Sequence, residues 1–315
     1  MKTVLITGGT GLIGTRLAQM LIEKGYQVIV LTRNIPDAKS IGDSIQYACW
    51  DIEHGVMDDA AITQSDYIIH LAGAGVADKR WTEKRKKEIA DSRTKSSALL
   101  LKKLAAIPNK VKAVISSSAI GWYGPDNQLS AQHGFKEDTE AAPDFLGNTC
   151  KAWEESILPS QGLNKRLVII RTGIVLSNLG GAFAEFKKPL KAGIAAILGN
   201  GKQVISWIHI DDICRIFLYA LEHEKMEGRF NGVAPNPATN KALTIQLAKM
   251  LRRKMFIPVH VPSIILKIML GEMSIEVLKS TTVSAEKIKS AGFTFLYPSL
   301  EAALGALTGP QVANK

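Results

Sequence analysis

The sequence predicts an α/β fold built on a doubly wound parallel sheet, with a smaller, mainly C-terminal part. Three observations support this prediction. Short apolar runs alternate with helical patterns through the first half of the chain. The first of these runs, residues 4–6, leads into closely spaced glycines and then a helical pattern. From Gly180 onward the composition changes, with more glycines and a cluster of lysines.

The composition is typical of a soluble globular protein. The chain has 315 residues, of which 46% are hydrophobic and 22% charged. Its three cysteines are far apart and form no C-x-x-C pair, which argues against a disulfide framework or a zinc site. We therefore expect a cytoplasmic protein without a bound metal. The apolar run after Lys2 is too short for a signal peptide, and no later run is long enough to span a membrane.

The formal net charge of +10 raises the possibility of nucleic-acid binding. The basic residues are spread along the chain, however, and no DNA- or RNA-binding motif accompanies them. We expect a small-molecule substrate, anionic in one interpretation, and no nucleic-acid or membrane partner. The sequence leaves the choice between monomer and homodimer open.

The first fifteen residues carry the strongest motif. Val4–Ile6 reads as a buried strand, and the pattern after Gly14 reads as a helix that stops at Gly25. Between them, Gly8, Gly11 and Gly14 recur at every third position. A helix N-terminus attracts phosphate, and missing side chains let a pyrophosphate approach the backbone. The stretch therefore predicts dinucleotide binding.

The second strand, residues 26–31, indicates which dinucleotide. It is followed by Arg33, and no carboxylate stands where NAD-binding versions of this fold hold the ribose 2′-hydroxyl. An arginine there can grip a 2′-phosphate with two parallel hydrogen bonds. We therefore predict NADP rather than NAD as the cofactor. The alternative interpretation is an exposed arginine at a strand end.

Two further strands end in residues that could face a ligand. The strand at residues 45–50 ends at Asp51, which could accept a hydrogen bond from an adenine amino group or cap a turn. The strand at residues 67–71 runs into the small residues 72–75, a sign of close backbone approach to a ligand. His70 is expected to pack within that strand.

The middle of the chain adds candidate polar residues. Residues 79–103 read as a largely solvated helix, with Lys79, Arg80 and Arg93 as candidate anion contacts. A strand at residues 111–115 runs into Ser116–Ser118, at the edge where such sheets bind ligands. Later elements are a helix at 147–158, a strand at 167–170, a helix from 207 capped by Asp211 or Asp212, a strand at 228–234 and a mostly helical remainder.

These residues together resemble the extended short-chain dehydrogenase/reductase superfamily, and more closely its nucleoside-diphosphate-sugar epimerase-like branch. The resemblance spans nearly the whole chain, and its motifs are TGGTGLIG (7–14), LAGAGVADKRWTEKRKKEIADSR (71–93), SSSAIGWYG (116–124), RTGIVLS (171–177), GNGKQVISWIHIDD (199–212) and GFTFLYPSLEAAL (292–304). It implies an NADP-binding Rossmann domain over residues 1–173, to which residues 205–232 return. Residues 174–315 would mainly form a substrate-binding domain.

The resemblance also implies roles for individual residues. The residues matching the cofactor site are Gly8, Thr10, Gly11, Leu12, Ile13 and Gly14 at the pyrophosphate turn, Arg33 at the 2′-phosphate, Asp51 at the adenine, and Leu71, Ala72 and Gly73 beside the ribose. Ser118 matches the family serine that orients the substrate's reacting oxygen.

The chain departs from the family in its catalytic Tyr-x-x-x-Lys pair. Lys151 is preceded four residues earlier by Gly147, and a shift of one residue gives Leu146 and Cys150 instead. In the family reaction, the tyrosine phenol is made more acidic by the neighbouring lysine and transfers a proton as hydride moves to or from the nicotinamide. Tyr123 is the nearest substitute, although it could equally pack the cleft wall. Thr149, Lys151 and Glu154 are further candidates, with a solvent-facing position as the default for Lys151 and Glu154.

Three functions compete on these residues. The first is an NADP(H)-dependent oxidoreductase for a carbonyl or secondary alcohol, with Ser118, Tyr123 and Lys151 as catalytic residues. The second is a nucleotide-sugar epimerase that retains its cofactor. The third is a binding protein that senses NADP(H) without chemistry.

Overall fold

The computed structural model describes residues 1–35, 45–253 and 255–309, and within them the chain forms two compact units. Unit 1 comprises Met1–Gly124, Glu137–Thr172 and Ile213–Asn231. Unit 2 comprises Pro125–Lys136, Gly173–Asp212 and the chain from Gly232. The assignment of cofactor to residues 1–173 and of substrate to residues 174–315 stays a prediction.

Unit 1 is built on an eight-stranded sheet in the order β12-β7-β6-β5-β1-β2-β3-β4. The six strands β7, β6, β5, β1, β2 and β3, in this order in the sheet, each pair in parallel with their neighbours. At one edge, β4 is antiparallel to β3. The bounds are β1 (Thr3–Thr7), β2 (Gln27–Thr32), β3 (Ile45–Asp51), β4 (Val56–Met57), β5 (Tyr67–His70), β6 (Ala113–Ala119), β7 (Arg166–Thr172) and β12 (Gly228–Gly232). This confirms the predicted doubly wound parallel sheet of the Rossmann type.

The strand order reverses beside β1. The chain moves outward from β1 to β2 and β3, then returns to place β5 on the other side of β1. In register, Thr7 at the end of β1 lies next to Leu31 of β2 and His70 of β5. Ligands of open parallel sheets bind at such a reversal, beyond the carboxyl ends of the strands. The predicted pyrophosphate loop and residues 71–73 therefore both begin at this point.

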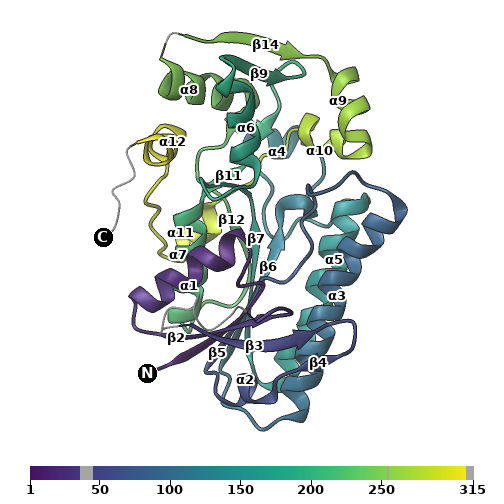
Figure 1. The fold of residues 1–315 in the computed structure, drawn as a ribbon, viewed down its shortest axis with the longest axis vertical. Helices are drawn as coiled ribbons and strands as arrows, with labels where there is room; N and C mark the ends of the chain where they lie inside the picture. Colours follow the sequence, from purple (N-terminus) through teal and green to yellow (C-terminus); the bar gives the residue numbers. More distant parts are fainter. Residues whose placement is uncertain (36–44, 254, 310–315) are drawn as a thin grey trace. The chain divides into compact units, whose positions relative to one another are not determined.

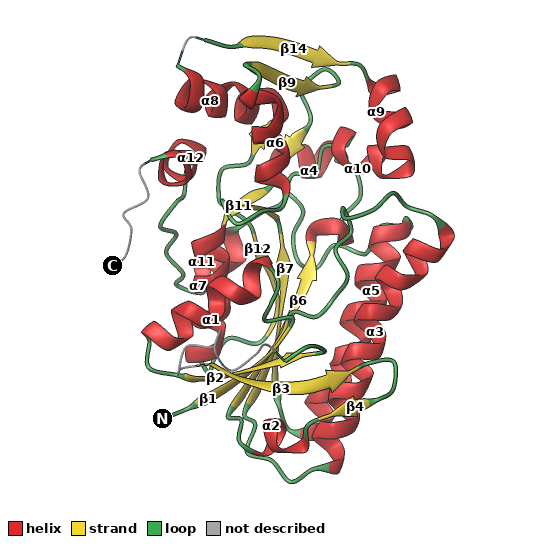
Figure 2. Ribbon diagram, viewed as in Figure 1, coloured by secondary structure: helices red, strands yellow, loops and turns green. Residues whose placement is uncertain are grey.

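Helices cover both faces of this sheet, with α1 and α7 on one side and α3 and α5 on the other (Figure 2). Their bounds are α1 (Leu12–Glu23), α2 (Asp59–Thr63), α3 (Glu83–Ala106), η2 (Ile120–Trp122), α5 (Phe145–Ile157), η3 (Leu158–Leu163) and α7 (Ile210–Glu222). The Thr82 side chain caps α3 by accepting from Arg85 N, so α3 begins at Glu83 and not at Lys79. Leu5, Ile68 and Leu100 are among the buried residues of one core layer.

Unit 2 combines short strand pairs with helices around Phe183, Trp207, Leu243 and Leu304 (Figure 1). The strands are β8 (Ile174–Leu176), β9 (Ile194–Leu198), β10 (Val204–Ile205), β11 (Trp207–His209), β13 (Ala238–Thr239) and β14 (Ile257–Val261). The helices are α4 (Gln128–His133), α6 (Ala182–Lys191), α8 (Asn240–Arg252), α9 (Ser263–Leu270), η4 (Gly271–Met273), α10 (Ser274–Leu278), α11 (Glu286–Ser290) and α12 (Leu300–Thr308).

The mostly helical remainder predicted after residue 234 contains α8 to α12, together with the short strands β13 and β14, and β14 runs parallel to β9. Asp212 is fully buried, but its two carboxylate oxygens accept from the backbone N–H groups of Leu296 and Tyr297, each at 2.8 Å. Asp212 therefore fixes a distant segment. Because α7 begins at Ile210, Asp211 and Asp212 both lie inside its first turn. Among the described residues, no helix combines the length and apolar character needed to cross a membrane.

Candidate functional site

The glycine loop between β1 and α1 has no room for side chains at two positions. Gly8 has a φ of +69°, and a Cβ there would lie 2.8 Å from the carbonyl carbon of Leu71. A Cβ on Gly14 would lie 2.3 Å from the carbonyl oxygen of Gly8. Both contacts are with backbone, which cannot move aside. The loop thus brings the ends of β1 and β5 and the start of α1 together.

The first turn of α1 has no side-chain cap. The helix begins at Leu12, its N-cap is Gly11, and no side chain accepts from the cap position. Thr10 and Gly11 are exposed, and Leu12 and Ile13 are partly exposed. Free N–H groups at a helix N-terminus bind anions such as phosphate. The cradle therefore fits the pyrophosphate of a dinucleotide.

Thr7 ties the backbone after β5 to the loop. Its Oγ1 accepts from the N–H groups of Leu71 and Ala72, at 3.1 and 3.2 Å. Its own proton is then left for His70 Nδ1, 2.7 Å away, and His70 Nε2 donates to Ser97 Oγ at 3.2 Å. Burial lowers the pKa of His70 to about 4, so the ring is neutral. His70 packs within β5 as predicted, and it helps to fix the path of residues 71–73.

The residues after Gly73 are held by α3. Ala74 N donates to Ser92 Oγ at 2.9 Å, and Arg93 Nη1 donates to the carbonyl oxygen of Ala74 at 3.0 Å. The Arg93 guanidinium also lies over the Trp153 ring, 4.8 Å from its centroid. Arg93 therefore has a structural role here, and its predicted anion contact stays a prediction.

The two predicted specificity residues differ in their surroundings. Arg33 follows β2 and is exposed, and the described part of the chain provides it with no hydrogen bond or ion pair. Asp51 accepts from the backbone of Glu53 and His54, at 2.9 and 3.2 Å, and from His54 Nδ1 at 2.7 Å. Asp51 thus caps a turn, which is one of its two interpretations, and the contact of Arg33 with a 2′-phosphate stays a prediction.

A buried ionic network lies behind the serine strand. Glu154 of α5 accepts from Ser118 Oγ at 2.8 Å, from Arg171 at 2.7 and 3.1 Å, and from Arg229 Nε at 2.7 Å. The side chains of Glu154 and Arg171 are each 1% exposed. The default solvent-facing position of Glu154 is therefore wrong. Because the Ser118 proton goes to Glu154, the lone pairs of Ser118 Oγ can accept from another donor.

Tyr123 belongs to the same network. Its hydroxyl donates to Asn231 Oδ1 at 2.7 Å and accepts from Arg171 Nη1 at 3.0 Å. Burial raises the pKa of Tyr123 to about 12, which keeps the phenol protonated at neutral pH. Two predicted catalytic residues, Ser118 and Tyr123, are thus linked through Glu154 and Arg171. No role was predicted for Arg171, Arg229 or Asn231, because nothing in the local sequence marks them as neighbours of Ser118.

The orientation of α5 decides which residues occupy the inward positions. A Cβ on Gly121 would contact Leu146 Cβ at 3.2 Å and Cys150 Sγ at 3.6 Å, so Leu146 and Cys150 face η2. A Cβ on Gly147 would lie 2.1 Å from the carbonyl oxygen of Ala142. Burial raises the pKa of the Cys150 thiol to about 12. The inward pair is therefore Leu146 and Cys150, and neither supplies a proton at neutral pH.

Lys151 lies outside this network. Its side chain is 57% exposed and lies 4.0 Å from Glu155 on the outer face of α5. The reason is the helical period, since burial of Cys150 and Glu154 turns Lys151 and Glu155 outward. This position does not support the catalytic role that we predicted for Lys151. Its default solvent-facing position is confirmed.

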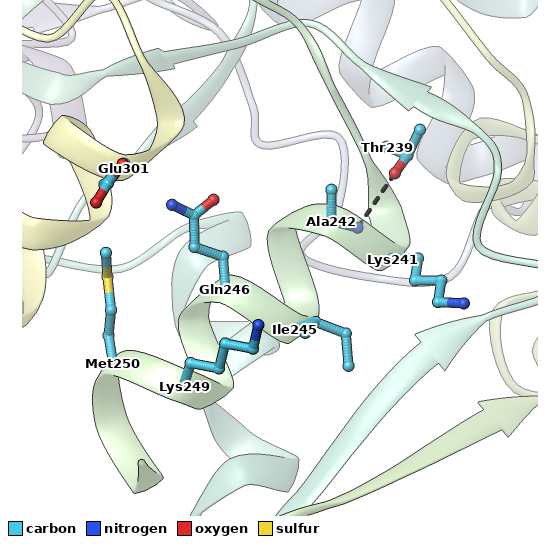
Figure 3. Close-up of a pocket in the computed structure, with 8 residues that line it drawn as sticks. All are labelled: Thr239, Lys241, Ala242, Ile245, Gln246, Lys249, Met250 and Glu301. Atoms are coloured by element: carbon cyan, nitrogen blue, oxygen red, sulfur yellow. Dashed lines mark hydrogen bonds between the residues drawn. The ribbon is translucent and has the colours of Figure 1, made fainter. Parts of the chain in front are cut away.

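Unit 2 carries an open groove of about 720 Å³ along α8 and beside α12 (Figure 3). Its lining includes Lys241, Gln246, Lys249 and Glu301, and the Thr239 hydroxyl accepts from Ala242 N at its start. None of these residues was a candidate. Within the described ranges, no group of three or more His, Cys, Asp or Glu side chains could hold a metal ion.

Comparison with known proteins agrees with this geometry. Residues 4–158 match the model of the NAD dependent epimerase/dehydratase family, and residues 261–307 match a domain of unknown function, DUF1731. An epimerase family protein of Staphylococcus saprophyticus is 35% identical over 307 residues, which cover 96% of this chain and 98% of that protein. The chain belongs to the NAD-dependent epimerase/dehydratase family. A second epimerase family protein, from Staphylococcus haemolyticus, is 34% identical over 304 residues.

Solved structures of this epimerase family extend the comparison. A human epimerase family protein, crystallised with NADPH, is 31% identical with a TM-score of 0.84, over 97% of this chain and 99% of that one. The UDP-glucuronic acid 4-epimerase of Bacillus cereus has a TM-score of 0.79 at 21% identity, covering 97% of this chain and 98% of that one. That second likeness shows the fold alone.

Proposed function

We propose that this protein binds NADP(H) and acts as an oxidoreductase on a carbonyl or secondary alcohol. The observation that carries the proposal is the glycine loop, whose Gly8 and Gly14 positions have no room for a Cβ beside an uncapped α1. Arg33 supports NADP over NAD, because it is exposed at the end of β2 without a partner in the described residues. The human relative crystallised with NADPH supports the same choice.

The chain's own residues would hold the cofactor as follows. The N–H groups at the start of α1 would bind the pyrophosphate, and Arg33 would bind the 2′-phosphate. The backbone of Leu71–Gly73, fixed through Thr7, would lie beside the ribose. The nicotinamide would supply hydride chemistry when bound.

Ser118 would orient the reacting oxygen of the substrate. Its hydroxyl donates to Glu154, which leaves Oγ as an acceptor for a substrate hydroxyl. This arrangement favours a secondary alcohol as the bound form. The protonated Tyr123 would keep Arg171 in place by accepting its hydrogen bond. A water molecule would take up or supply the hydroxyl proton of the substrate. The substrate itself remains our proposal of a small molecule, with its identity set by unit 2.

Calorimetry with purified protein tests the cofactor. We expect NADPH to bind more tightly than NADH, and Arg33→Ala to weaken NADPH binding by at least about tenfold while leaving NADH binding unchanged. Lys24→Ala removes another exposed cation, at the far end of α1, and serves as the matched control. Equal affinity of the wild type for the two cofactors, or equal losses in the two variants, would contradict the choice of NADP.

The inward pair Leu146 and Cys150 favours a second candidate, an NADP(H)-binding protein without turnover. A panel of carbonyl and alcohol substrates distinguishes the two. Turnover that falls strongly in Ser118→Ala supports the oxidoreductase, and tight NADPH binding without any turnover supports the second candidate. Conversion of nucleotide sugars without net NADPH consumption would instead support an epimerase.

A further inference from the structure

One end of unit 2 exposes an unusual amount of apolar surface. Among the described residues, seventeen large apolar side chains are exposed, and nine of them lie between Leu251 and Ile275. We call the part formed by β14, α9 and Met255, which precedes β14, the α9–β14 face. Its exposed apolar residues are Met255, Ile257, Val259, Ile264, Ile265, Ile268 and Met269. Large contiguous apolar patches on proteins mark interaction sites, whereas scattered exposed residues do not.

Helix α9 turns its apolar side outward. At 100° per residue, Ile264, Ile265, Ile268 and Met269 share one arc of the helix, and Ile264 and Ile268 are 66% and 69% exposed. Only Leu266 of this helix is buried. A helix that packs for the stability of its own unit would direct this arc inward. The outward apolar arc is therefore not explained by the core of unit 2.

Strand β14 adds further exposed apolar side chains. It leads directly into α9 (Figure 1), and it pairs only with β9 in its sheet. Residues 257–260 of β14 are all exposed, with Ile257 at 69%. In register, Ile257 lies next to Ile194 of β9, which is 40% exposed. Exposed apolar side chains therefore occur on both strands of this pair and on the helix that follows it.

The charge near this face is mainly positive, although Glu272 and Glu276 follow on η4 and α10. Residues 241–271 contain six lysines and arginines and no aspartate or glutamate. Lys249, Arg253 and Lys267 are exposed among them. An apolar surface with an excess of cations nearby is complementary to the headgroups and acyl chains of an anionic bilayer.

We propose that the α9–β14 face docks this protein on the surface of an anionic membrane. Ile264, Ile268 and Met269 would enter the headgroup–acyl boundary, and Arg253 and Lys267 would contact lipid phosphates. The helix has eight residues, so it lies on the surface and does not cross it. This docking departs from our expectation of no membrane partner, which rested on the absence of an apolar run long enough to span a membrane, because docking on a surface needs no such run.

A second copy of this chain fits the face less well. A two-fold contact would bring the same cations of both copies together. Strand addition at β14 would meet Pro258, which has no N–H to donate and is typical of edges that avoid pairing. Charge and backbone chemistry therefore both favour a lipid surface.

Vesicle sedimentation of the full-length protein tests the proposal. Vesicles of phosphatidylcholine with about 30 mol% phosphatidylglycerol, which gives the surface a negative potential, are compared with vesicles of pure phosphatidylcholine. We expect binding to the anionic vesicles only, and weaker binding at high salt. The double variants Ile264→Ser/Ile268→Ser and Arg253→Glu/Lys267→Glu should each lower the partition coefficient by at least about tenfold.

Leu129→Ser provides the matched control, because Leu129 is 70% exposed but lies on α4. It should bind vesicles like the wild type. Urea unfolding midpoints close to that of the wild type show that the variants fold, as expected for exposed positions. Failure of the wild type to bind anionic vesicles, or equal binding by the variants, overturns the proposal. So does a wild-type dimer in gel filtration that Ile264→Ser/Ile268→Ser dissociates, since the face would then belong to a second copy.

Discussion

Glu154 and Arg171 form a bidentate ion pair in the interior of unit 1. Glu154 Oε1 accepts from Arg171 Nε at 2.7 Å, and Oε2 accepts from Nη2 at 3.1 Å. Each side chain is 1% exposed, and Ser118 and Arg229 donate to the same carboxylate. A buried ion pair of this kind adds little stability compared with well-packed apolar residues. Each charge nevertheless depends on the other, because a buried charge without its partner is strongly destabilising.

Removal of one partner should therefore be costly. We expect Glu154→Ala to lower the free energy of unfolding by about 3–5 kcal/mol, because Arg171 would be left buried and unpaired. Urea unfolding followed by circular dichroism measures the change. Glu155→Ala, on the exposed face of α5, is the control and should change stability by less than about 0.5 kcal/mol. A loss for Glu154→Ala no larger than for the control would contradict the buried pair.

The stability of the fold should fall in mild acid because of His70. Its pKa is lowered from 6.5 to about 4 by burial, so the unfolded chain takes up the proton first. The contribution is fully present above about pH 6.5, and it is lost as the pH falls toward about 4. From pH 7.5 to pH 5 we expect a loss of about 2 kcal/mol. Urea unfolding at both pH values gives the measurement.

The variant His70→Asn removes the titrating ring and is the control for this pH dependence. Its starting stability is lower, because the hydrogen bonds to Thr7 and Ser97 change. The difference between pH 7.5 and pH 5 should shrink by most of the amount seen in the wild type. An unchanged difference would show that His70 is not the group responsible.

Gly14 should tolerate no side chain. The Cβ of Gly14→Ala would lie 2.3 Å from the carbonyl oxygen of Gly8, so the loop would have to open. We expect NADPH affinity to fall by at least about tenfold in calorimetry. Gly305→Ala is the matched control, since no heavy atom lies within 4 Å of its Cβ position in α12. That control should keep its NADPH affinity and gain up to about 1 kcal/mol of stability.

Gly147 and Lys151, one of the two possible matches to the Tyr-x-x-x-Lys motif, should differ strongly in the effect of substitution by alanine. Gly147→Ala would place a Cβ 2.1 Å from the carbonyl oxygen of Ala142, and we expect it to cost about 1–3 kcal/mol of stability. Lys151→Ala should leave stability and any NADPH-dependent turnover within error of the wild type, because its side chain is 57% exposed. Unfolding and turnover assays on both variants check this. A large loss of turnover in Lys151→Ala would restore its predicted role.

The glycine loop and most of the sheet were predictable because their signals are local. Val4–Ile6 lies within β1, and residues 67–70 form β5, since buried parallel strands read as short apolar runs. The strand β14 was not predictable, because Ile257–Val261 contains Pro258 and lies in a segment with helical neighbours. The start of α3 was misplaced because the Thr82 cap follows basic residues that also suit a helix.

The buried network could not be predicted for a different reason. Glu154 and Arg171 are seventeen residues apart, and only the pairing of β6 with β7 and the packing of α5 bring them to Ser118. A carboxylate on a helix with exposed neighbours such as Lys151 and Glu155 reads as solvated. Local patterns also could not decide whether Gly147 and Lys151 or Leu146 and Cys150 occupy the inward positions of α5. Only the contacts of Gly121 and Gly147 in the folded structure decide it.

The tight approach of Gly147 to Ala142 also constrains how this protein can change over time. A tyrosine introduced at position 147 would clash with this backbone and displace the start of α5, so it could not take up the position of a catalytic residue. A Tyr-x-x-x-Lys pair in the other register would need replacements of both Leu146 and Cys150, which pack against η2. Each replacement alone would place a polar group in an apolar contact. A single substitution at either position would therefore disturb the packing of α5 without completing the pair.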